Sequence, residues 1–344
     1  MDLSDRKRRI LLTLVEQYIQ TGEPVGSKAL AERLPDHPSS ATIRNEMAQL
    51  TELGYLDQPH TSAGRVPSPK GYRFYVDALS PEQALSFAQR ARLEAELRGR
   101  AREPERLLES AGKLLAEITA CAALCVSPGG ADTRIRRVEM APVGVRMAMV
   151  ALLTSCGTVK SKILRTDSEC TPVIRETFYR MAEEHLLGLP LEDCTLPAMQ
   201  SLAARAGSEM LAMFSLLAAV AELAAEAAGA ELLLDGQSNL YQHRELESDA
   251  TQLLSLLRDA DAVRQLLGHT AAGGLHVILG REPPMEAPAM QNASMILAPY
   301  RIGQEQSGLL GVVGPLRVDY ARLIPSVRCL TEMVGQLMSQ ALEE

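Results

Sequence analysis

Apolar residues recur at helical spacing in three stretches at the start of the chain. The first stretch follows Ser4, a favourable helix N-cap, and ends at Gly22. The second opens at Pro24 and stops at Pro35, and the third covers about Ala41 to Leu53. Because each stretch has one apolar face, we expect three amphipathic helices that share a core.

The pattern changes directly after the third helix. Tyr55 to Gln58 is typical of a short strand, Pro59 to Gly64 of a turn, and Arg65 to Pro67 of a return strand. Three helices followed by a hairpin is the order of a winged helix-turn-helix domain, which reads DNA with its last helix. We therefore predict a winged helix-turn-helix DNA-binding domain in residues 1–80.

The rest of the chain mixes helices and strands. Residues 81–104 favour a connecting helix or linker, and Pro197 to Ala230 is alanine-rich and helical. We place Cys121 and Cys125 on a buried helical face, where packing explains them better than redox chemistry. Strands are expected at 143–154, 158–165, 232–234, 275–279, 294–301 and 308–314. Together these elements predict an α+β multidomain protein.

The overall charge does not favour a nucleic-acid binder. The chain has 344 residues, with 35 basic and 43 acidic side chains and a net charge of −8. The first 80 residues carry as many basic as acidic side chains, so the usual test of a basic DNA-binding domain fails. A DNA-binding interpretation must therefore depend on where the charges lie.

Cysteine usage and hydropathy favour the cytoplasm. The six cysteines are scattered without a CxxC pair, which is typical of reduced thiols in a cytoplasmic protein. We find no run of about 20 apolar residues and no secretory signal pattern, so we expect no membrane partner.

An enzyme is the first alternative, and no motif favours it. His185, His243, His269 and His276 show no metal-ligand spacing, and no Gly-x-Ser-x-Gly motif is present. The spaced glycines at 308, 311 and 314 fall in a predicted strand, not before a phosphate-binding helix. We expect no enzymatic activity, no metal and no cofactor.

The outer face of the third predicted helix suits the major groove. Asn45 lies opposite the apolar face, and Arg44 and Gln49 flank it; amides can pair with adenine and arginine with guanine or phosphate. Ser39, Ser40 and Thr42 at the start of this helix favour a phosphate. A helix exposed only to solvent would show a similar face, so this pattern alone does not distinguish a DNA-reading helix from a solvated one.

The predicted hairpin favours the DNA-binding alternative. Its loop contains His60, Thr61 and Ser62, has no acidic residue and leads into Arg65, and wings place such residues on the backbone or in the minor groove. Lys70 and Arg73 add positive charge near the base of the hairpin. This local asymmetry can offset a net charge of zero.

Several motifs resemble the heat-inducible transcription repressor family HrcA. The resemblance is dense over about residues 4 to 79. It is carried by Val25-Gly26-Ser27-Lys28-Ala29-Leu30, by Ser39-Ser40-Ala41-Thr42-Ile43-Arg44-Asn45-Glu46-Met47, by His60-Thr61-Ser62-Ala63-Gly64-Arg65-Val66-Pro67 and by Gly71-Tyr72-Arg73-Phe74-Tyr75-Val76. It resumes at residues 235–240 and 311–320, where Leu316 and Val318 replace the family's usual Thr and Met. The candidate DNA-binding residues are Ser27, Lys28, Ser39, Ser40, Thr42, Arg44, Asn45, Gln49, His60, Thr61, Ser62, Arg65, Lys70 and Arg73.

The resemblance implies an architecture and partners. It implies a GAF-like α/β domain in residues 105–185 and 263–344, interrupted by a helix-rich dimerisation domain in residues 186–262. It also implies a homodimer that represses chaperonin and DnaK operons by binding an inverted-repeat operator in double-stranded DNA, with its activity promoted by the GroE chaperonin. The helical block between two groups of strands is compatible with an insertion.

A ligand-sensing regulator is the second alternative, because GAF-like domains often hold small molecules. The carboxy-terminal half has no aromatic cage and few convergent charges, so we expect no small-molecule effector. A thermal-shift screen against metabolites would distinguish a ligand-sensing regulator from a repressor without an effector. A large shift of the melting temperature with one ligand would favour the sensor.

Overall fold

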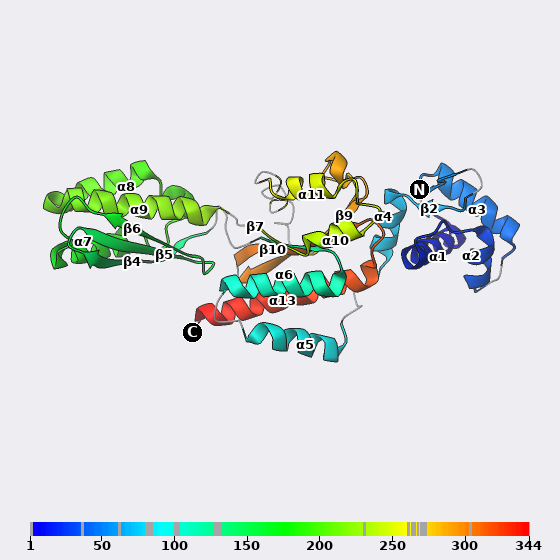
Figure 1. The fold of residues 1–344 in the computed structure, drawn as a ribbon, viewed down its shortest axis with the longest axis horizontal. Coiled ribbons are helices and arrows are strands. Elements are labelled where there is room, and N and C mark those ends of the chain that lie inside the picture. Colours follow the sequence, from blue (N-terminus) through cyan, green and yellow to red (C-terminus); the bar gives the residue numbers. More distant parts are fainter. Residues whose placement is uncertain are drawn as a thin grey trace.

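The molecule consists of three bodies in a row. Figure 1 shows the computed structural model, with the amino-terminal body at one end, a central body, and a third body at the other end. We call these the head (residues 3–79), the central domain (85–126 and 232–343) and the insert (133–229). The structure describes residues 3–35, 38–60, 63–79, 85–99, 104–126, 133–229, 232–259, 262, 266, 268, 274–302 and 305–343.

The head has the element order that the sequence predicts. Its elements are α1 (Asp5–Thr21), α2 (Ser27–Arg33), α3 (Ser40–Glu52), β1 (Leu56–Asp57), β2 (Val66–Pro67) and α4 (Pro69–Ala78). Ser4 caps α1 by accepting a hydrogen bond from the Lys7 amide at 3.4 Å, and Gly22 closes the helix with a φ of 71°. The two strands pair antiparallel, with Leu56 opposite Pro67. The predicted winged helix architecture is confirmed.

The central domain is built around a five-stranded antiparallel sheet. The strands lie in the order β7 (Leu232–Asp235), β3 (Ala122–Val126), β10 (Glu305–Pro315), β9 (Ala293–Ile302) and β8 (His276–Leu279). The helices are α5 (Phe87–Arg98), α6 (Pro104–Thr119), α10 (Gln237–Gln242), α11 (Ala250–Leu257) and α13 (Tyr320–Glu343). Helices α6 and α13 cover one face of the sheet, whereas α10 and α11 pack on the other (Figure 1).

Strand β3 separates two cores, because alternate side chains of a strand point to opposite faces. Ala123 and Cys125 pack with α6 and α13, whereas Leu124 and Val126 pack with the helices on the other face. A strand buried on both faces is apolar throughout and shows no alternation. Our expectation that Cys121 and Cys125 lie on a helical face is therefore wrong: Cys125 lies in β3, and Cys121 directly precedes it.

The insert has its own sheet and its own core. Its elements are β4 (Ile135–Gly144), β5 (Met147–Thr154), β6 (Val159–Arg165), α7 (Pro172–His185), α8 (Leu196–Ala203) and α9 (Met210–Ala228). The strands lie in the order β4-β5-β6, and both pairings are antiparallel. One face of this sheet, with Val150 at its centre, packs against α7 and α9, and Phe178 is fully buried there.

The boundaries of the insert differ from the predicted ones. We expected residues 105–185 in the GAF-like domain and 186–262 in the insert. In the structure β4, β5 and β6 form a sheet of their own, and α10 and α11 pack on the central sheet. The insert therefore covers 133–229 within the described residues. Strand pairing decides which domain a strand joins, and a local hydrophobic pattern carries no information on its partner.

Among the described residues, one helical stretch is long and apolar enough to cross a membrane, judged by length and composition alone. It spans Leu196–Ala228, and 56% of its most apolar window is buried inside the insert. Gly207, with φ 62° and ψ −121°, interrupts the stretch between α8 and α9. Met213 and Leu217 on α9 are fully buried in the insert core, so this stretch packs as a core helix.

Candidate nucleic-acid interface

Helix α3 presents a polar face to solvent at one end of the molecule (Figure 1). Its apolar side, which includes Ile43 and Leu50, is buried in the head core. On the other side Arg44, Asn45 and Gln49 are all exposed. These three side chains can offer amide and guanidinium groups to base edges, which is the chemistry that direct readout in the major groove requires.

Hydroxyl groups gather at the start of α3. The Ser39 hydroxyl accepts a hydrogen bond from the Thr42 amide at 3.1 Å and lies 2.9 Å from the Thr42 hydroxyl. Ser39 and Ser40 are exposed, and Thr42 is half-buried. Ser39 thus acts as the helix N-cap, while the neighbouring hydroxyls remain available to a phosphate oxygen.

The wing is tied to the helices that precede it. Val25 and Arg65 exchange two backbone hydrogen bonds of 2.9 Å, which adds a third short segment to the hairpin. A Cβ atom on Gly64 would lie 2.4 Å from the Val25 carbonyl oxygen, so this close approach requires glycine. The Nε of Arg65 donates to the Thr51 hydroxyl at 3.1 Å, which joins the base of the wing to α3.

Lys70 lies at the other end of α3. Its Nζ donates to the carbonyl oxygen of Leu53 at 2.9 Å and lies 4.3 Å from the centre of the Tyr55 ring. A cation at this position stabilises the unpaired carbonyls at the carboxyl end of a helix. Lys70 is also exposed, so it adds positive charge beside the wing.

Known proteins similar to this chain cover its whole length. A family model described as the winged helix-turn-helix transcription repressor HrcA DNA-binding domain matches residues 2–78, and the HrcA protein C-terminal domain matches residues 105–324. The heat-inducible transcription repressor HrcA of Shouchella clausii is 32% identical over 96% of both chains. That of Thermobifida fusca is 35% identical over 98% of this chain and 97% of the relative.

The chain belongs to the HrcA family of heat-inducible transcription repressors. The resemblance drawn from the sequence motifs is confirmed, and so is the expectation of a transcription regulator that is not an enzyme. A crystal structure described as that of a hypothetical protein shares the HrcA-like fold of this chain. It has a TM-score of 0.63 and 25% identity, and the match covers 99% of this chain and 100% of that one.

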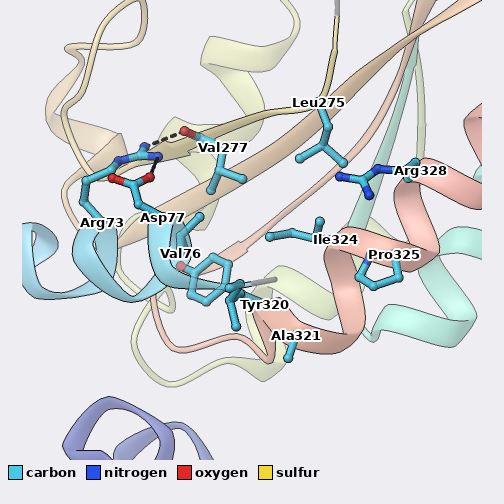
Figure 2. Close-up of a pocket in the computed structure, with 11 residues that line it drawn as sticks. Arg73, Val76, Asp77, Leu275, Val277, Tyr320, Ala321, Ile324, Pro325 and Arg328 are labelled. Carbon is cyan, nitrogen blue, oxygen red and sulfur yellow. Dashed lines mark hydrogen bonds and ion pairs between the residues drawn. The ribbon is translucent and has the colours of Figure 1, made fainter. Parts of the chain in front are cut away.

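Arg73 of this HrcA-family chain contacts the central domain, and we correct its assignment. Its Nε donates to the Glu282 carboxylate at 3.1 Å, and its Nη2 donates to the same carboxylate and to the Val277 carbonyl oxygen. Figure 2 shows Arg73 reaching toward Val277 beside a cavity of about 210 Å³ between α4, β8 and α13. Arg73 therefore joins the head to the central domain, and we remove it from the candidate DNA-binding set.

The remaining predicted residues of the HrcA-type head have varied positions. Lys28 is exposed and Ser27 half-buried at the start of α2, and His60 is exposed beside β1. Thr61 and Ser62 lie outside the described residues. Arg6 and Arg9 on α1, which no motif marked, line a cavity near the start of α3. The signal that could have found them is the uninterrupted basic run from Arg6 to Arg9.

Proposed function

We propose that this chain is a homodimeric repressor that binds an inverted-repeat operator in double-stranded DNA with its two heads. The observation that carries the proposal is the exposed polar face of α3 beside a wing that is fixed to it through Arg65 and Thr51. A dimer with two such heads would contact two half-sites, and the symmetry of the operator would follow that of the protein. Occupation of the promoter would then exclude RNA polymerase in the cytoplasm.

The candidate residues divide into two roles. Arg44, Asn45 and Gln49 on the exposed face of α3 read base edges. Hydroxyl and basic groups around them contact the phosphate backbone and set the register of the head on the duplex. This second group comprises Ser27, Lys28, Ser39, Ser40, Thr42, His60, Thr61, Ser62, Arg65 and Lys70.

Substitution of Asn45 tests the base-reading role. Asn45→Ala should weaken binding to the operator by about 1–3 kcal/mol and leave binding to a scrambled duplex of equal length nearly unchanged. Fluorescence anisotropy on both duplexes measures this difference, with the operator defined by footprinting on the genomic DNA of the source organism. Arg92→Ala is the control, because Arg92 is 82% exposed on α5 of the central domain. Equal losses on both duplexes would refute the assignment.

The insert supplies the best candidate surface for dimerisation. The face of its sheet turned away from α7 and α9 carries Met147, Val159 and Ile163, which are 45%, 55% and 59% exposed. No described element covers these side chains. Arg137, Glu139 and Arg165 lie on the same face, and exposed apolar side chains framed by charged ones are typical of an interface. A second copy of the same sheet would present the same apolar side chains, which is the self-complementarity that a two-fold interface needs.

A charge placed on this sheet face tests the dimer. Ile163→Glu should convert the dimer to a monomer, because burying an unpaired carboxylate in the interface is costly. Val173→Glu is the matched control, since Val173 is 57% exposed but lies on α7, on the covered side of the sheet. Sedimentation equilibrium on both variants gives the molecular mass. A dimer that persists in Ile163→Glu would place the interface elsewhere.

We further propose, on family resemblance alone, that the targets are chaperonin and DnaK operons and that the GroE chaperonin promotes the active form. We also infer that the central domain is GAF-like. Its five strands form one antiparallel sheet with helices on both faces. The chaperonin proposal predicts that operator binding lost on heating returns faster when GroE is present. Equal recovery without GroE would contradict it.

A further inference from the structure

One carboxylate lies at the centre of the face that α3 turns to solvent. Glu52 is the last residue of α3 and is exposed. It follows Ile43, which is fully buried in the head core, by nine residues. Nine residues of an α-helix turn through about 900°, or roughly two and a half turns, so Glu52 lies directly opposite the buried side. By the same geometry Glu52 lies within about 20° of the direction of Asn45.

The carboxylate of Glu52 forms no hydrogen bond and no ion pair within the described part of the chain. Two cations are bound instead to the residues that flank it in sequence. Arg65 donates to the Thr51 hydroxyl at 3.1 Å, and Lys70 donates to the Leu53 carbonyl oxygen at 2.9 Å. The carboxylate is therefore available to a ligand that approaches the exposed face of α3.

This carboxylate is unfavourable both for the helix and for general affinity for DNA. The carboxyl end of a helix carries a partial negative charge, and α3 has no basic residue in its last turn to offset it. The phosphates of any duplex also repel a carboxylate on the surface that approaches them. Neither the stability of α3 nor sequence-independent binding accounts for Glu52, whereas a contact with a particular base does.

Cytosine offers the group that a carboxylate binds in the major groove. Its N4 amine is a donor, and glutamate accepts a hydrogen bond from it. Guanine and thymine present acceptor oxygens there, which repel a carboxylate. Adenine presents an amine beside the N7 acceptor, and this pair suits an amide better. Glu52 therefore adds a different base preference to the amides of Asn45 and Gln49 on the same face.

We propose that Glu52 is a specificity-determining residue, whose carboxylate accepts a hydrogen bond from the N4 amine of one cytosine in each half-site. The proposal rests on the DNA-binding function proposed above and deepens it. The helix rises about 10 Å from Asn45 to Glu52, which equals roughly three base-pair steps of 3.4 Å. The cytosine should thus lie within about three base pairs of the base that Asn45 reads.

The test combines substitutions in the operator with substitutions in the full-length protein. Each C·G pair is changed in turn to A·T in both half-sites, and fluorescence anisotropy measures binding. At the contacted position the unmodified protein should lose roughly tenfold in affinity. Glu52→Ala should bind both sequences equally well at that position. Glu52→Gln should favour A·T there, because glutamine pairs with adenine.

Glu16→Ala is the matched control, because it removes the same charge from another exposed position of the head. Burial raises the pKa of Tyr75 to about 12, and the nearby carboxylates of Glu16 and Asp319 contribute to the rise. Glu16 therefore lies on the side of the head that is joined to the central domain. Glu16→Ala should keep the preference for C·G, and circular dichroism should show a folded head in every variant.

Two results would overturn the assignment of Glu52. One is a base preference that is the same in Glu52→Ala and in the unmodified protein at every position. The other is a gain in affinity of Glu52→Ala that is equal for the operator and the scrambled duplex, since Glu52 would then only repel phosphates. If instead the unmodified protein shows no preference for its operator and Asn45→Ala has no effect, the proposed function itself fails.

Discussion

The head and the insert are attached to the central domain in different ways. Buried residues of the head and of α6 and α13 form one continuous core, in which Tyr72 packs against Tyr320 with ring centres 6.1 Å apart. The insert has a separate core, and Cys156 is its only described residue buried in the shared one. Regions that share a core unfold together, whereas separate cores can unfold independently. The DNA-binding surface is thus coupled more closely to the central domain than the insert is.

Two arginines strengthen the junction of the head. Arg73 reaches from the head to Glu282, and Arg317 reaches from the central domain to the head. Arg317 donates to the Ile19 carbonyl oxygen at 3.2 Å and to the Glu245 carboxylate at 2.9 Å. Helix α1 has no basic residue in its own last turn, so the central domain supplies the cation that stabilises its carboxyl end.

Disrupting the hydrophobic core of the insert should give the largest loss of stability. Phe178→Ala removes a fully buried ring and should destabilise the insert by about 3–5 kcal/mol. Because the cores are separate, hydrogen exchange should accelerate in residues 133–229 and remain slow in the head. Phe87→Ala is the control, since Phe87 is 89% exposed. Equal acceleration in the head would show that the two junctions do not differ.

Removing the Arg317 contact at the carboxyl end of α1 should cause a smaller loss of stability. This loss should fall on the head and central domain, not on the insert. Arg317→Ala should destabilise the unit of head and central domain by about 1–2 kcal/mol, because its contacts are only partly buried. Thermal unfolding should show a lower midpoint for this unit, while exchange in the insert stays unchanged. Arg317 lies close to Gly22, where an added Cβ atom would sit 3.1 Å from the guanidinium carbon, so a larger residue at position 22 would disturb this contact. An unaltered midpoint would mean that the shared core alone holds the head.

Local patterns explain why the head was predicted well and its junction was not. The caps Ser4 and Ser39, the closing Gly22 and the change of period at Tyr55 are all local signals, and the helices begin and end within a residue or two of them. Arg73 was assigned to DNA because its partner Glu282 is 209 residues away in sequence. The same limit applies to the cavity at Arg6, because its second wall is formed by another helix.

The strands of the insert also show that a local sequence pattern does not reveal partners that are distant in sequence. The sequence predicts strands at 143–154 and 158–165, and β5 and β6 occupy parts of these ranges. Nothing in their apolar pattern tells whether they join β3 or form a second sheet, so they were assigned to the wrong domain. β4 was not predicted, since its exposed charges, such as Arg136 and Arg137, obscure the alternation that would mark it.

The smallest effect should come from a single hydroxyl in the shared core. Tyr72 is 2% exposed, and its hydroxyl oxygen has no hydrogen-bond partner within the described part of the chain. Burial raises the pKa of this phenol, so the group stays neutral and carries the cost of an unpaired polar atom. Tyr72→Phe should therefore stabilise the unit of head and central domain by about 1 kcal/mol.

Tyr320 provides the matched control, because its ring neighbours that of Tyr72 while its hydroxyl donates to the Leu316 carbonyl oxygen at 2.7 Å. Tyr320→Phe loses that bond and leaves a part-buried carbonyl with one partner fewer, so it should destabilise the same unit by a similar amount. Urea unfolding of both variants measures the two changes on one scale. If Tyr72→Phe stabilises the unit and Tyr320→Phe destabilises it, the junction contains an unsatisfied polar group. Such a group makes the docking of the head weaker than its buried area alone would give. Losses of equal size would mean that the Tyr72 hydroxyl is hydrated, and the comparison between the junctions would then rest on their cores and arginines alone.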